Sequence, residues 1–194
     1  MEAEPFIFTI FFLTIGPIKT IPAFAKIMHS MSLAFKREVA VKGVLIASAI
    51  CLFIVLLGRS LLARYKISLE AVEIATGIVL LLSALKAIFP VVHPVEPPVP
   101  ANPTAIQLAI SPVASPIIVP PVGIAVILIF IMIAPRYPGM DFAIVKVLSL
   151  MMLLNFLVMF FIDKIMKVTG LMLIFNVFAA TLVFSRLRWQ SKPF

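Results

Sequence analysis

Six apolar segments, each long enough to cross a lipid bilayer, account for most of this chain of 194 residues. A membrane-spanning helix needs about 20 mostly apolar residues, because the hydrocarbon core is about 30 Å thick and a helix rises about 1.5 Å per residue. The segments cover residues 6–28, 39–62, 69–89, 104–134, 142–162 and 168–187. We therefore expect an all-α, polytopic transmembrane helical bundle of about six spans, forming a single integral membrane domain over residues 1–194.

The composition excludes a water-soluble fold. Hydrophobic residues make up 63% of the chain and charged residues 12%, whereas soluble domains are about half apolar and a quarter charged. A chain this short cannot bury so much apolar surface in water. The net charge of +8 fits basic residues that flank apolar spans and meet anionic headgroups. Membrane lipids are the expected partners, and nucleic acid is not, since no basic stripe alternates with aromatic residues.

Prolines interrupt the first and the fourth apolar segments. They are Pro17 and Pro22 in the first segment and Pro112, Pro116, Pro120 and Pro121 in the fourth. A proline inside a helix removes a hydrogen bond and clashes with the preceding turn. The freed backbone groups are costly in hydrocarbon unless protein or water satisfies them. We expect both spans to be broken, with half-helix N-termini that suit an anionic group; kinks that only shape packing are the alternative.

A proline-rich linker at residues 90–103 divides the chain into a first repeat, residues 1–89, and a second repeat, residues 104–194. Each half opens with a broken segment, begins its middle segment with Val-Lys and carries Thr-Gly in its third. Three spans per half is an odd number, so the second half would insert upside down. The pattern predicts a 3+3 inverted repeat with a solute site near the bilayer midplane; chance recurrence of dipeptides is the alternative.

The breaks supply the candidate substrate-binding residues. These are Pro17, Lys19, Thr20, Pro112, Ser115 and Pro116. Thr20 and Ser115 would offer hydroxyls and Lys19 a positive charge, since a charged residue within a span suggests function. Lys19 could instead extend to the headgroups or pair with Glu73. A desolvated Glu73 could also carry a proton.

Other polar residues within the spans have simpler interpretations. Asn155 and Asn176 lie in the middle of the fifth and sixth segments, where amides form interhelical hydrogen bonds. The single cysteine, Cys51, cannot form an internal disulfide, and His29 and His93 have no neighbours at metal-ligand spacing. No catalytic motif is present. We therefore expect neither a metal, nor a cofactor, nor an enzyme.

The N-terminus favours a retained first span and one orientation. It has no basic region and no small-residue cleavage site, so the first segment does not resemble a signal peptide. Lys and Arg divide almost equally between the two sides of a six-span protein. The first segment follows Glu2 and Glu4 and precedes a basic cluster, which favours both termini outside. A location in the cytoplasmic membrane as a multi-pass protein is expected.

The motifs at the breaks resemble those of the MarC family of multi-pass membrane proteins, which includes neutral amino acid transporters. Residues 16–22, Gly-Pro-Ile-Lys-Thr-Ile-Pro, resemble the family's Asp-Pro-(Ile/Leu)-Gly-Asn-(Ile/Leu)-Pro. Residues 74–80, Ile-Ala-Thr-Gly-Ile-Val-Leu, resemble its Ile-Ala-Gly-Gly-Ile-Leu-Leu. Residues 112–116, Pro-Val-Ala-Ser-Pro, resemble its Pro-Leu-Ala-x-Pro. The resemblance implies a secondary transporter or exporter of small solutes, such as neutral amino acids, and a homo-oligomer is compatible with it.

The chain departs from the family pattern at the breaks themselves. The family's Asp, Gly and Asn of the first motif correspond to Gly16, Lys19 and Thr20, and its Gly-Pro-Gly is Pro-Pro-Val at residues 120–122. These are the positions that a substrate site would use. Two hypotheses follow: a transporter, with or without a changed substrate, or a non-transporting membrane protein that acts through partner or lipid binding.

Overall fold

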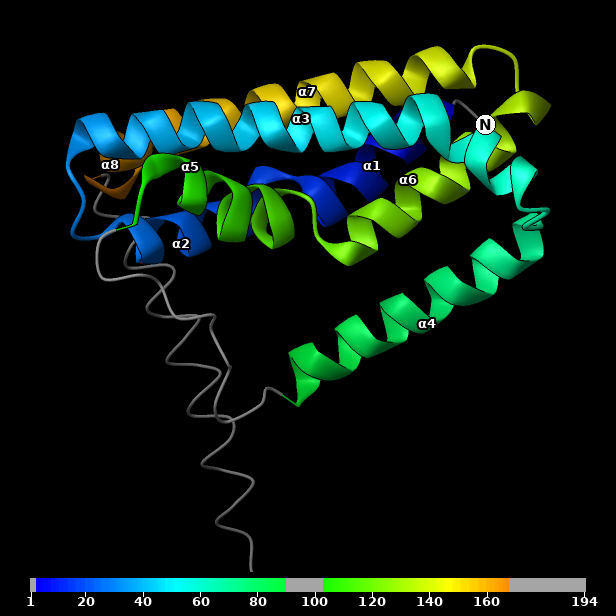
Figure 1. The fold of residues 1–194 in the computed structure, drawn as a ribbon, viewed down its shortest axis with the longest axis horizontal. Coiled ribbons are helices and arrows are strands. Elements are labelled where there is room, and N and C mark those ends of the chain that lie inside the picture. The colour runs from blue at the N-terminus through cyan, green and yellow to red at the C-terminus, as the bar shows by residue number, and fades with distance from the viewer. Residues whose placement is uncertain (1–2, 90–102, 168–194) are drawn as a thin grey trace, which may run out of the picture. The chain divides into compact units, whose positions relative to one another are not determined.

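The computed structural model describes residues 3–89 and 103–167, and helices make up nearly all of them (Figure 1). The chain divides into two units, residues 1–160 and residues 161–194. The first contains α1 (Ala3–Ile15), α2 (Pro17–Met28), α3 (Leu33–Arg64), α4 (Leu69–Ile88), α5 (Ala105–Leu108), η1 (Ala109–Ile118), α6 (Pro121–Ile133), η2 (Ala134–Arg136) and α7 (Met140–Phe160). The second contains α8 (Ile162–Lys167). The expected sixth span and the linker, apart from Pro103, lie outside the described residues.

The expected break in the first span is confirmed. Helix α1 ends at Ile15 and α2 begins at Pro17, a position where a missing N–H costs nothing. Between them Gly16 is extended and buried, and its N–H donates to the carbonyl oxygen of Phe12 at 3.0 Å. A Cβ at Gly16 would lie 2.0 Å from that oxygen. The backbone of this junction therefore accepts only glycine unless it shifts.

Helix α3 is the longest element and packs closely on the second broken region. The hydroxyl of Ser32 caps it by accepting from the N–H of Phe35 at 3.3 Å. A Cβ at Gly43 would lie 2.6 Å from Val113 Cγ1 in η1, and one at Gly58 would lie 2.7 Å from Ile131 Cδ1 in α6. These glycines allow α3 to approach both halves of the broken region closely.

The expected break in the fourth span is also confirmed, and it is wider than the first. A capping box between Thr104 and Gln107 starts α5, and the segment η1, whose helical path is interrupted by a kink, follows it. Within η1, Ser111 and Ser115 are extended, and each precedes a proline across a cis peptide bond. The α5–η1 segment and the α6–η2 segment are bent by 61° relative to each other.

The packing of the helices places the two broken regions side by side and antiparallel. Helix α1 packs against α6, and α2 packs against η1, so the first half of one broken region lies beside the second half of the other. Helix α7 packs against α1 and α2, and α3 packs against η1 and α6. Helices α3 and α7 pack against each other (Figure 1). Each broken region thus packs against an unbroken helix.

Three described helical stretches, the first of them made of α1 and α2, are long and apolar enough to cross a membrane, or four if the bent pair counts as one span. They cover Glu4–Met28, Leu33–Arg64 and Met140–Phe160, with the bent pair Ala105–Ile118 and Pro121–Arg136. Helix α4, which occupies the third expected span, is not among them and carries Glu70, Glu73 and Lys86. The membrane-protein class is therefore supported, while the full six-span arrangement stays a prediction.

A glycine-to-alanine pair tests the junction at Gly16. We expect Gly16→Ala to lower the free energy of unfolding by about 2 kcal/mol, because the added Cβ forces the backbone apart from Phe12. Gly77→Ala is the matched control, since no atom lies within 4 Å of a Cβ there. It should be neutral or slightly stabilising. Thermal unfolding of both variants in detergent measures the difference, and equal midpoints would contradict the close approach.

Candidate functional site

The two broken spans meet where α1 ends and α6 begins. A Cβ at Gly123, in the first turn of α6, would lie 2.9 Å from Ile15 Cγ1 and 3.3 Å from Pro120 Cδ. Ile15 and Gly123 are both buried. The residue before the first break thus packs against the first turn after the second break. The two breaks therefore lie close together in the packed bundle.

A buried amide satisfies the backbone that the first break exposes. Asn155 of α7 donates from Nδ2 to the carbonyl oxygens of Ile15 and Met151, each at 2.8 Å. Its Oδ1 accepts from the hydroxyl of Thr20 in α2 at 2.7 Å. Asn155 and Thr20 are fully buried. One side chain of α7 therefore joins the end of α1 to the first turn of α2, as expected for an interhelical hydrogen bond.

Lys19 binds the same helix end from the other side of the break. Its Nζ donates to the carbonyl oxygen of Thr14, and the side chain is partly buried. A cation at a helix C-terminus stabilises the free carbonyls and the negative end of the helix dipole. The described residues show no ion pair between Lys19 and Glu73, whose side chain is exposed on α4. In this structure Lys19 caps α1.

The candidate residues of the second break lie on η1 with different exposure. Pro112 and Ser115 are half-buried and Pro116 is exposed. Because η1 packs against α2, they belong to the same region as the buried Pro17 and Thr20. The hydroxyl of Thr20 nevertheless donates its hydrogen bond to Asn155 Oδ1 and not to Ser115. The candidate residues thus lie on two elements that pack together, α2 and η1. Their role in binding stays a prediction.

Glu73 lies apart from the contact between α2 and η1. Helix α4 packs chiefly against α6, and its buried residues are Val72 and Thr76. Thr76 of the Thr-Gly motif is thus buried, whereas Gly77 is exposed and has no atom of another element near it. Access of Glu73 to a solute between the breaks would require movement of α4 or α6.

Polar contacts fasten the bundle at the end where α3 finishes and α7 begins. Arg59 of α3 donates from Nε to the carbonyl oxygen of Ile131 at 3.0 Å and from Nη2 to Asp141 at 2.7 Å. Lys146 of α7 pairs with Glu4 of α1. These contacts join α1, α3, α6 and α7 at one end. They also show that α3 and α7 are antiparallel.

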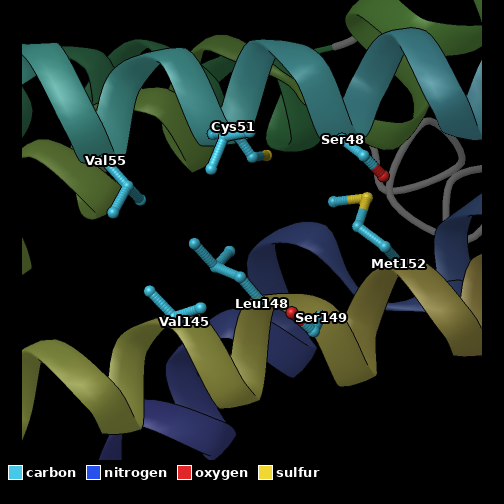
Figure 2. A pocket seen from close by; sticks show the side chains of 8 residues that line it. Ser48, Cys51, Val55, Val145, Leu148, Ser149 and Met152 are labelled. Atoms are coloured by element: carbon cyan, nitrogen blue, oxygen red, sulfur yellow. The ribbon is translucent and has the colours of Figure 1, made fainter.

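A cavity of about 340 Å³ lies between α3 and α7 (Figure 2). The labelled side chains of α3 and α7 point toward one another across it. Its lining residues are Ser48, Cys51, Leu52, Val55, Val145, Leu148, Ser149 and Met152. Most of the lining is apolar, with one serine on each helix. Sequence reasoning did not identify this cavity, because no motif marks a gap between two unbroken helices.

Sequence reasoning left Asn155 out of the candidate site, although it joins both halves of the first break. A lone amide in an apolar helix signals a hydrogen bond but does not name its partner. Nothing in the sequence marked Gly123 and Ile15 as site residues, because their contact depends on how the two broken spans cross. Among the described residues no group of three or more His, Cys, Asp or Glu side chains could hold a metal ion.

The fold and these buried breaks define an integral membrane protein with discontinuous helices. Residues 5–185 match the model of the MarC family integral membrane proteins, and the chain belongs to that family. It is also 31% identical over 78 residues to a "UPF0056 membrane protein" of Buchnera aphidicola subsp. Schizaphis graminum (strain Sg). The alignment covers 40% of this chain and 40% of that relative. No solved structure matches the chain.

A double-mutant cycle tests the buried link between α2 and α7. We expect Asn155→Leu to cost about 1–2 kcal/mol of stability, because it leaves the Ile15 carbonyl and the Thr20 hydroxyl without partners. Thr20→Val alone should cost less, and the double variant should cost less than the sum of the two. Reversible unfolding in mixed micelles gives the four free energies. Additive effects would show that the two side chains do not interact.

Proposed function

We propose that the protein is a secondary transporter or exporter of small solutes such as neutral amino acids. The observation that carries this proposal is the antiparallel crossing of two broken spans, with Ile15 against Gly123 at the breaks. Discontinuous helices that meet within a membrane place free backbone groups and helix ends beside a possible solute. Membership of the MarC family supports the proposal.

We further propose that the chain is built as an inverted repeat. The packing supports this, because exchanging α1 with η1, α2 with α6 and α3 with α7 converts most packed pairs of these elements into other observed pairs. The pair α3–η1 becomes α7–α1, α3–α6 becomes α7–α2, and α1–α6 becomes η1–α2. The antiparallel pair α3–α7 becomes itself. A two-fold relation in the membrane plane would produce this pattern.

In the proposed mechanism the solute binds between α2 and η1. The hydroxyls of Thr20 and Ser115 would bind its polar groups, and Lys19 would attract a carboxylate. The free N–H groups at the start of α2, next to Pro17, would add to that attraction. Pro112 and Pro116 would hold η1 out of a regular helix. Glu73 would exchange a proton when α4 moves relative to α6.

Solute uptake into proteoliposomes tests the proposal. A panel of neutral amino acids, with and without an imposed proton gradient, should reveal gradient-dependent flux of at least one solute. Ser115→Ala should reduce that flux about tenfold, which corresponds to loss of one well-placed hydrogen bond. Glu73→Gln should remove the dependence on the gradient while leaving exchange of labelled for unlabelled solute.

Ser83→Ala is the matched control for this assay. Ser83 lies on α4, and its hydroxyl donates within its own helix to the carbonyl oxygen of Val79 at 2.7 Å. Its removal should leave flux unchanged. Absence of flux for every solute, in protein that elutes as a single species and unfolds cooperatively, would refute the transport proposal.

A second function is favoured by the packing at the breaks. Thr20, Asn155 and Ile15 are fully buried, and Lys19 and Asn155 already occupy the freed carbonyls of α1. This arrangement suits a non-transporting membrane protein that acts through partner or lipid binding. Folded protein without flux that nevertheless co-purifies with one defined partner would support this alternative.

We propose that the protein lies in the cytoplasmic membrane with both termini outside. The acidic N-terminal end of the first span and the basic residues after α2 support this orientation. In a Cys51→Ala background, Tyr65→Cys should react with a membrane-impermeant maleimide in intact cells, and His29→Cys should not. Tyr65 and His29 are both exposed and lie at opposite ends of α3. The reverse labelling pattern would overturn the orientation.

A further inference from the structure

Arg37 carries an unsatisfied donor near the start of α3. Its Nε is buried and has no hydrogen-bond partner among the residues that the structure describes. The guanidinium carbon lies 4.8 Å from the ring centroid of Phe160, near the end of α7. A buried donor without an acceptor is costly, and each such case calls for a missing partner. The guanidinium group favours phosphate and carboxylate oxygens.

An apolar groove begins one helical turn from this pair. Val41 follows Arg37 by four residues on α3, and Phe156 precedes Phe160 by four on α7, so each lies on the same face as its neighbour. The rings of Phe156 and Phe160 are 5.3 Å apart. The groove has a volume of about 240 Å³. Its lining residues are Val41, Val44, Leu45, Met152, Leu153 and Phe156.

The groove continues along the same seam into the cavity of Figure 2. Met152 lines both spaces. From Val41 to Val55 the lining residues of α3 extend over about 21 Å, at about 1.5 Å per residue. That length exceeds half of a hydrocarbon core of about 30 Å. Leu45 and Leu52 are exposed beside it. The groove and the cavity together form an elongated apolar space, which fits a hydrocarbon chain better than it fits a compact solute.

We propose that this seam binds one anionic phospholipid, with the phosphate on Arg37 and an acyl chain between α3 and α7. Arg37 lies four residues after the first residue of α3, or about 6 Å along the helix. At that depth a guanidinium reaches headgroup oxygens while its neighbours contact acyl chains. Basic sites next to interhelical gaps are a recognised arrangement for lipid headgroups.

Charge complementarity selects this occupant over a second copy of the chain. The net charge is +8, so another copy would bring more positive charge to Arg37. Lys42, one turn away, already pairs with Glu38 of the same helix. A lipid phosphate would supply the acceptor that the guanidinium lacks once the Arg37 side chain turns its buried Nε outward, and the acyl chain would fill the apolar groove. The inference is independent of whether the protein transports a solute.

Native mass spectrometry of the full-length protein tests the proposal. Protein in detergent is titrated with phosphatidylglycerol, with phosphatidylcholine of the same acyl chains, or with inorganic phosphate. One phosphatidylglycerol should bind with an affinity at least about tenfold above that of phosphatidylcholine, as charge-assisted hydrogen bonds allow. Inorganic phosphate should not compete at matched concentration. Equal binding of both lipids, or competition by phosphate alone, would overturn the assignment.

Two pairs of variants separate the headgroup from the groove. Arg37→Gln should weaken phosphatidylglycerol binding about tenfold, whereas Arg64→Gln, which removes the same charge at the far end of α3, should not. Leu45→Trp should block the groove, whereas Leu56→Trp should not; both leucines are 64% exposed and on α3. If Arg37→Gln does not fold, phosphatidylglycerol binding by Arg37→Lys and by the two tryptophan variants tests the site instead. Equal effects within either pair, or a change only in oligomeric state, would refute the site.

Discussion

The buried hydrogen bonds of Asn155 are the interaction on which the broken core depends. In hydrocarbon no water replaces a lost helical hydrogen bond, so every break needs a protein donor or acceptor nearby. Asn155 supplies one for Ile15 and Lys19 supplies another for Thr14. Because Asn155 also accepts from Thr20, the position of α7 sets the angle at which α1 meets α2. The neighbouring region, η1 and α6, then packs against a fixed surface.

The same constraint explains which features could be predicted from the sequence. Pro17 and the prolines of η1 break helices through local chemistry, so both breaks were predictable. An amide in the middle of a span must find a partner, which made the role of Asn155 predictable in kind. The identity of that partner was not predictable, because the Ile15 carbonyl comes within reach of Asn155 only through tertiary packing. The extended backbone at Ser111 and Ser115 follows from local chemistry as well, because a residue before proline disfavours the helical region.

Lys19 illustrates the limit of assigning function from residue type. A lysine within a span suggests a substrate charge or an ion pair, yet its described partner is a backbone carbonyl of the preceding helix. Binding of a solute there would compete with capping of α1. Arg37 is the opposite case. It lies near a helix end, where a basic residue does not by itself suggest a function. Its unpartnered Nε becomes evident only when the packing of α7 is known.

The contacts of Arg59 have a mechanical consequence. Arg59 ties α3 to α6 and α7, and Lys146 ties α7 to α1, so four elements are clamped at the same end. At the start of α3, the guanidinium of Arg37 lies over the ring of Phe160. Any separation of α3 from α7 would be resisted at the end where Arg59 binds Asp141 and the Ile131 carbonyl. Chemical groups close to that end would move least during such a separation.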